Sequence, residues 1–152
     1  MSAEITLLTQ IRKLTYMVIK DLTPEQCLHV PDKFDNNIAW NLGHMIVVQQ
    51  LLTYARSGLK PYVSDEMVAM YRPGTSPADW TTQPDMQELF AMSREHIAQL
   101  TADYAAGKFA NYGGYTSSTT GINLTTIDEA LGFNNYHEGL HMGAIMAIKN
   151  LL

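Results

Sequence analysis

The sequence has only one cysteine, Cys27, among its 152 residues. A single thiol cannot form an internal disulfide, and it excludes the zinc modules that are built from several cysteines. A fold that needs no disulfide suits a reducing compartment, so the cytoplasm is the expected location. We interpret Cys27 itself as a small hydrophobic residue of the core.

Positive charge and long apolar runs are scarce as well. The chain has 10 Lys and Arg against 15 Asp and Glu, which gives a net charge of −5. This sign disfavours phosphate backbones and anionic lipid, so nucleic acid and membrane surfaces are not expected partners. No run approaches the roughly 18 apolar residues of a membrane-spanning helix, and polar residues interrupt positions 1–20, so no signal peptide is expected. The expected partner is a small-molecule substrate, and a homodimer formed through an apolar helix face stays open.

The length and the apolar content predict one domain, residues 1–152, with an ordinary hydrophobic core. Apolar residues recur with helical spacing in four segments. The expected helices cover about residues 3–21, Ile38 to Gly58, Pro84 to Gly107, and Thr125 or Thr126 to the C-terminus, with Asn36 or Asn37 as the cap of the second. The sequence therefore predicts an all-α fold, a four-helix bundle.

The connections between these helices are long. Residues 22–37 carry Pro24 and Pro31 and are expected to form a loop. Residues 58–83 are broken by prolines and leave room only for a short helix around Ser64–Tyr71, capped by Ser64. Residues 107–124 show no helical pattern, and a loop of that length is usually functional or contains a small hairpin.

Two histidines lie four residues apart in the last predicted helix, in the string F-N-N-Y-H-E-G-L-H at residues 133–141. On a helix, His137 and His141 are about 40° apart around the axis and about 6 Å apart along it. Apolar residues share their face, and an unpartnered imidazole is costly in an apolar interior. The pair is therefore either two core histidines bonded to carbonyls or to each other, or two ligands of one metal ion.

A third histidine lies on the inward face of the second predicted helix, in the string I-A-W-N-L-G-H-M at residues 38–45. Measured along the helix axis from each predicted helix start, His44 lies about 12 Å in and His137 about 18 Å in. These positions let the two residues meet if the two helices run parallel, as in an up-down bundle. Three imidazoles leave a divalent ion coordinatively open, and zinc, nickel or ferrous iron would accept them. The other two histidines, His29 and His96, are interpreted as solvated or capping residues.

The segment from His137 to His141 also matches H-E-x-x-H, the zinc metalloprotease motif in which the glutamate is the general base. That class needs a third ligand further along the chain. After His141 the sequence contains neither an acid nor another histidine, so the third ligand must come from upstream, which favours His44. Glu138 lies about 100° around the helix from His137. It either reaches a bound water or faces solvent, and we favour the solvent-facing interpretation.

Two motifs resemble those of a known family. N-N-I-A-W-N-L-G-H-M and F-N-N-Y-H-E-G-L-H-M-G, together with P-D-K-F-D and G-T-S-P-A, are similar to the DinB superfamily over nearly the whole chain. The resemblance implies a four-helix bundle, often dimeric, with a divalent metal site of three histidines that commonly holds nickel, zinc or iron. The family's metal ligands fall on His44, His137 and His141. Members with known activity are mostly transferases or isomerases that use a low-molecular-weight thiol such as bacillithiol, mycothiol or glutathione.

These observations leave three functional hypotheses. In the first, His44, His137 and His141 hold a metal ion that ionises a substrate thiol, since coordination to a divalent cation deprotonates a thiol near neutral pH. Asn134 or Asn41 would then orient a ligand or the substrate, and Glu138 would handle protons. In the second hypothesis the same site activates water to hydrolyse a small ester or amide. In the third, the protein is a non-catalytic bundle that binds a metal ion or a partner.

Overall fold

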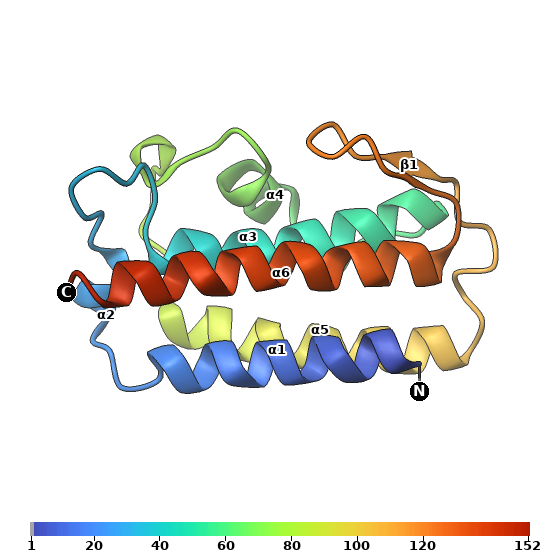
Figure 1. Ribbon diagram of the computed structural model, residues 1–152, viewed down its shortest axis with the longest axis horizontal. Coiled ribbons are helices and arrows are strands. Elements are labelled where there is room, and N and C mark those ends of the chain that lie inside the picture. The colour runs from blue at the N-terminus through green and yellow to red at the C-terminus, as the bar shows by residue number, and fades with distance from the viewer. Residues whose placement is uncertain (1) are drawn as a thin grey trace.

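The structure is a computed structural model that describes residues 2–152, and four long helices dominate it (Figure 1). In chain order its elements are α1 (Ala3–Ile19), α2 (Pro24–Leu28), α3 (Ile38–Thr53), η1 (Ala55–Ser57), α4 (Asp65–Tyr71), η2 (Pro77–Asp79), α5 (Met86–Ala105), β1 (Tyr115–Thr116), β2 (Asn123–Leu124) and α6 (Ile127–Lys149), where η denotes a 3₁₀ turn. The all-α bundle is therefore confirmed, and its long helices are α1, α3, α5 and α6.

Side-chain caps fix where the helices begin. Asn37 Oδ1 accepts a hydrogen bond from the backbone N–H of Trp40 at 2.8 Å, so the predicted cap of the second long helix is confirmed. Thr126 and Glu129 form a capping box at the start of α6, where the sequence placed the last helix. At α5 the cap is Asp85, so Pro84 precedes the helix and does not begin it.

A short helix, α2, occupies part of the segment that we expected to be a loop. Thr23 Oγ1 accepts from the N–H of Gln26 at 3.2 Å, and Gln26 Oε1 accepts from the N–H of Thr23 at 2.9 Å. Pro24 is the first helical residue, where its missing N–H costs nothing. The expectation was wrong because we took the prolines as marks of a loop and did not recognise the capping box of Thr23 and Gln26. Cys27, on this helix, is 1% exposed, as expected for a core residue.

The helix directions differ from an up-down bundle. α6 packs against both α1 and α3, and it runs parallel to α1 but antiparallel to α3 (Figure 1). The side-chain contacts show the antiparallel order, because Asn41 meets His141 whereas His44 meets His137. The expectation of parallel helices was therefore wrong. The physical reason is the connection over residues 54–85, which returns along the whole bundle and makes α3 and α5 parallel neighbours.

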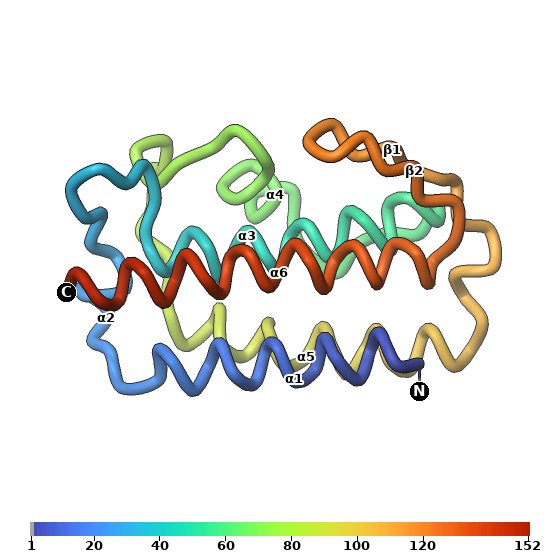
Figure 2. The backbone as a smooth tube through the Cα atoms, in the orientation of Figure 1, coloured from blue at the N-terminus to red at the C-terminus, as the bar shows by residue number. Residues whose placement is uncertain are grey.

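Helix α3 lies at the centre of the fold. Nearly all of its residues are buried, because α5 and α6 flank it in the bundle and α4 lies against its outer side (Figure 2). A helix that is mostly apolar around its whole circumference requires such complete cover. The crossover between α3 and α5, residues 54–85, thus supplies part of the core.

The segment between α5 and α6 contains a small hairpin, one of the two alternatives that its length suggested. β1 and β2 pair antiparallel, with Tyr115 opposite Leu124. The guanidinium carbon of Arg56 lies 4.6 Å from the ring centroid of Tyr115, and the Gly113 N–H donates to the Arg56 carbonyl at 2.7 Å, which ties the hairpin segment to η1. Among residues 2–152, no helix is both long enough and apolar enough to cross a membrane.

Candidate metal centre

Three histidines from two helices meet between α3 and α6. One ligand nitrogen each from His44, His137 and His141 lies within 4.8 Å of the others. The Nε2 atoms of His44 and His137 are 3.2 Å apart. Two nitrogens bound to one zinc ion in tetrahedral geometry are about 3.4 Å apart. The structure thus brings together the three residues that the sequence singled out, and they could hold one metal ion.

The backbone of α4 orients His44. Nδ1 of His44 lies 2.6 Å from the carbonyl oxygen of Tyr71. A carbonyl can only accept a hydrogen bond, so the neutral ring has its proton on Nδ1 and presents a bare Nε2 to the other histidines. Metal-binding histidines are usually held by such an outer hydrogen bond. No side-chain pattern in the sequence identifies Tyr71, because it contributes a backbone oxygen.

Asn41 orients His141 in the same way. The Oδ1 atom of Asn41 lies 2.8 Å from Nδ1 of His141. The amide nitrogen of Asn41 donates to the Asn37 carbonyl and to Asn36 Oδ1, each at 2.8 Å, so its oxygen must be the atom that faces the ring. His141 therefore has its proton on Nδ1 and a bare Nε2. Asn41, predicted to orient a ligand, does lie beside the histidines.

His137 has no such partner. Its Nδ1 atom is buried and, among residues 2–152, has no hydrogen-bond partner. Its Nε2 lies 3.2 Å from that of His44, within hydrogen-bonding distance. Burying three neutral imidazoles side by side with few hydrogen bonds is costly, and a cation shared by their Nε2 atoms would offset part of that cost. The donor set therefore fits a divalent ion.

Burial keeps the three rings neutral. Desolvation is the largest cause of the lowered pKa of all three histidines. The pKa of His137 falls to about 3, with further lowering by His141, His44 and Arg12. The pKa of His141 falls to about 4, with a further contribution from His44. Neutral imidazole is the form that binds metal ions, and it is the form of all three rings at pH 7.

An aromatic ring covers one side of the cluster. Trp40 stacks on His44 with ring centroids 4.5 Å apart and an angle of 17° between the planes. Its Nε1–H donates to Thr75 Oγ1 at 3.2 Å, and Thr75 belongs to the crossover between α3 and α5. Trp40 is 7% exposed, so it excludes water from this side of His44. The crossover thus supports His44 twice, through Tyr71 and through Trp40.

Replacing Gly43 with alanine is expected to disturb this support. A Cβ atom at position 43 would lie 2.3 Å from Cε1 of Tyr71, much closer than atoms pack, and Tyr71 is fully buried. The ring would have to move, and its backbone carbonyl would move away from His44. We expect a loss of about 1–3 kcal/mol in the free energy of unfolding, as for other overpacked cores, together with weaker zinc binding. Urea denaturation and zinc titration measure the two effects.

Gly132→Ala is the matched control, because a Cβ atom there meets nothing within 4 Å. Alanine is the better helix former, so this variant should be as stable as the parent or more stable by up to about 1 kcal/mol. Equal stability and equal zinc affinity in the two alanine variants would show that Tyr71 does not constrain the site.

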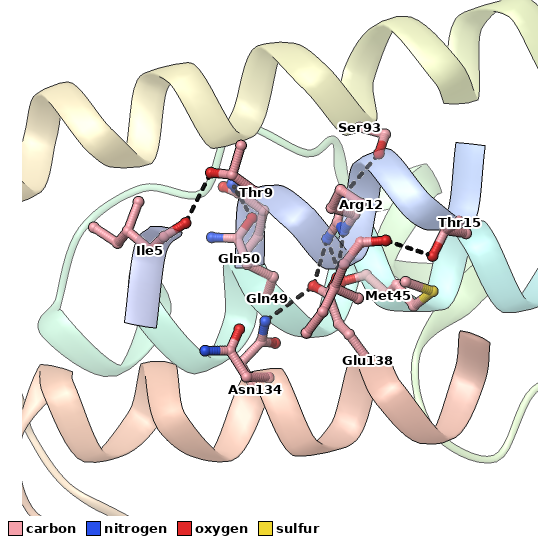
Figure 3. A network of polar contacts seen from close by, with 12 residues as sticks. Ile5, Thr9, Arg12, Thr15, Met45, Gln49, Gln50, Ser93, Asn134 and Glu138 are labelled. Carbon is pink, nitrogen blue, oxygen red and sulfur yellow. Dashed lines mark hydrogen bonds and ion pairs between the residues drawn. The ribbon is translucent and has the colours of Figure 1, made fainter. Parts of the chain in front are cut away.

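Glu138 is buried, so the interpretation that it faces solvent was wrong. Its side chain is fully buried, and its carboxylate accepts from Arg12 Nε at 2.5 Å and from Arg12 Nη2 at 2.7 Å (Figure 3). Asn134 Nδ2 donates to the same carboxylate at 2.9 Å. Both carboxylate oxygens are occupied on the α1 side of α6, whereas the histidines face α3. Helical spacing could not predict this burial, because the partner Arg12 lies 126 residues away in the sequence.

The two remaining histidines lie outside the cluster. His29 is exposed just after α2, as expected. His96 is 7% exposed, so the expectation that it is solvated was wrong, and burial lowers its pKa. Its neighbours Arg94 and Glu95 are exposed, but each step along a helix turns the side chain by about 100°, which brings His96 to the inner face.

Comparisons with known proteins add one finding. A search among curated proteins found no match. The family model of the DinB superfamily matches residues 7–145, a range that contains α3, α4, α5, the three histidines and the residues that orient them. Since this match covers most of the chain, the protein belongs to the DinB superfamily.

Proposed function

We propose that the protein is a metal-dependent enzyme that joins a small thiol to an electrophilic substrate. His44, His137 and His141 would hold one divalent ion, which is zinc, nickel or iron. The observation that carries this proposal is the set of three neutral imidazoles, two of which have their Nδ1 protons tied to Tyr71 and Asn41. Histidines that bind a metal ion usually donate their other ring N–H to an acceptor in this way, which fixes the tautomer.

The chemistry follows from the charge of the ligands. Three neutral ligands leave the full charge of a divalent ion and at least one open position, as in catalytic sites. A divalent ion held there would supply ionisation near neutral pH of a thiol bound at the open position. The residues of the chain would keep the ligand nitrogens bare, and Trp40 would keep water away from one side.

The sulfur must come with the substrate. Cys27 is 1% exposed, and burial raises the pKa of its thiol to about 11, so it stays protonated and unreactive at pH 7. Ester or amide hydrolysis by the metalloprotease route is less well supported, since that route needs a free carboxylate as base. The carboxylate of Glu138 is ion-paired with Arg12.

A paired assay tests the function. Zinc-loaded protein is mixed with bacillithiol, mycothiol or glutathione and 1-chloro-2,4-dinitrobenzene, and loss of free thiol is followed. We expect catalysed thiol loss with at least one of the thiols. The loss should stop after chelation and should persist in Cys27→Ala, because the chain's own thiol takes no part.

The same samples are tested on p-nitrophenyl acetate without thiol. Hydrolysis that depends on the metal ion, with no catalysed thiol loss, would favour the hydrolase. Bound metal with neither activity would favour a binding role. Both outcomes would contradict the proposal.

A further inference from the structure

A cavity lies between α1 and α5, outside the histidine cluster. Its volume is about 250 Å³, and α1, α5 and Leu42 of α3 line it. α1 and α5 run antiparallel, so residues later in α1 lie opposite residues earlier in α5. Tyr16 lies against Phe90, with ring centroids 5.2 Å apart, and Arg12 contacts Ser93.

The lining is positively charged in a chain that is acidic overall. Arg12, Lys13 and Arg94 are three of the 10 cationic residues, and none of the 15 acidic residues lines the cavity. Glu138 balances the charge of Arg12. Lys13 and Arg94 are exposed, and within residues 2–152 neither forms an ion pair. The cavity therefore carries two uncompensated positive charges.

The buried side of the cavity has spare hydrogen-bond donors. Arg12 is 5% exposed and has five N–H groups, of which four donate to Glu138, Ser93 and the Met45 carbonyl. The hydrogen without a partner is on Nη1. The Ser93 hydroxyl accepts from Nη1 at 3.2 Å, and its own proton has no acceptor among residues 2–152. An anionic oxygen would satisfy both donors, which are costly to leave unpaired when buried.

The polar groups occupy one level of the cavity. The neighbours Arg12 and Lys13 on α1 face the neighbours Ser93 and Arg94 on α5. The rings of Tyr16 and Phe90 lie next to that level along the two helices. A cavity of roughly 150 Å³ with apolar walls can hold benzene, so this one has room for a substituted ring and a charged group. The lining thus matches a ligand with one anionic end and one apolar body.

We propose that the α1–α5 cavity binds a small organic carboxylate with an apolar body. The carboxylate lies at the level of Lys13 and Arg94 and accepts from Arg12 and Ser93. The apolar body packs against the rings of Tyr16 and Phe90. This site is separate from the metal centre, since the histidines lie between α3 and α6.

The test compares matched probes by titration calorimetry. The probes are 4-methylbenzoate, the uncharged 4-methylbenzamide of nearly the same shape, and acetate, which lacks the apolar body. We expect the benzoate to bind about tenfold more tightly than either of the others, because only it uses both features of the cavity. The titrations are repeated on chelator-treated protein, so that failure of the metal-site proposal does not affect the result.

Two variants locate the binding site. Lys13→Gln with Arg94→Gln removes the two exposed charges without touching the core, and it should weaken benzoate binding about tenfold. Thr9→Trp should abolish binding, because Thr9 lines the cavity and an indole would fill it. The control is Lys60→Gln with Arg72→Gln, which changes the net charge equally at two exposed positions outside the cavity and should bind like the parent.

Three results would overturn the proposal. These are no benzoate binding up to about 10 mM, amide binding as tight as benzoate binding, and unchanged affinity in both Thr9→Trp and the Lys13, Arg94 double variant. Circular dichroism of each variant checks that the helices remain folded.

Discussion

Replacing Arg12 with methionine is expected to lower the free energy of unfolding by about 3–5 kcal/mol, the usual cost of breaking a buried ion pair from one side. The Glu138 carboxylate accepts three hydrogen bonds. It would lose the two from Arg12 and keep only the one from Asn134, while it stays fully buried. Methionine fills much of the volume of arginine, so the loss reflects the unpaired charge and not a cavity. Urea denaturation followed by circular dichroism measures the change.

The double variant Arg12→Met with Glu138→Leu separates charge from shape. Removing both partners leaves no buried charge, and such replacements are often neutral or stabilising. We expect the double variant to recover most of the stability that Arg12→Met loses. A double variant no more stable than Arg12→Met would show that packing around these positions, and not the unpaired carboxylate, accounts for the loss.

Replacing His44 with alanine is expected to remove the metal ion. Protein purified without chelator or affinity tag should contain close to one equivalent of divalent metal, and His44→Ala less than about a tenth of an equivalent. The same loss is expected for His141→Ala. The physical reason is that two imidazoles hold a divalent ion far less tightly than three, and no other His, Cys, Asp or Glu of residues 2–152 belongs to this cluster. Elemental analysis of the purified proteins measures the content.

Two further variants test the metal site, one as a control and one with an intermediate loss of metal binding. His29→Ala is the matched control, because His29 is exposed outside the cluster, and its metal content should equal that of the parent. Asn41→Ala removes the acceptor of the His141 Nδ1 proton, and loss of such outer partners typically weakens metal binding about 10–100-fold. Equal metal content in His44→Ala, His141→Ala and the parent would contradict the metal site.

The fold was predictable where the signal is local. Asn37 and Thr126 precede apolar helical patterns and do cap α3 and α6, because a cap needs only its own next three residues. The direction of α3 relative to α6 was not predictable in this way. It depends on how the crossover between α3 and α5 travels, and helical periodicity contains no information about the path of a connection.

In the candidate site, too, local patterns predicted some residues and missed others. Histidine spacing within α6 and the shared inward face of α3 identified three residues that the structure does bring together. Their supports were harder to foresee, since Tyr71 contributes a backbone oxygen. Glu138 was misplaced because its partner Arg12 is remote in sequence, and the burial of a single glutamate depends on that partner.

The crossover between α3 and α5 also limits how this protein can change. Surface connections usually tolerate insertions, deletions and exchange between homologues. Here the carbonyl that fixes His44 and the hydroxyl that holds Trp40 both belong to the connection, at Tyr71 and Thr75. Grafting this segment from a relative would therefore exchange the surroundings of the histidines along with the loop. A protease cut between α4 and η2 would fall beside Tyr71 and Thr75, so the metal centre should be sensitive to cleavage of this connection.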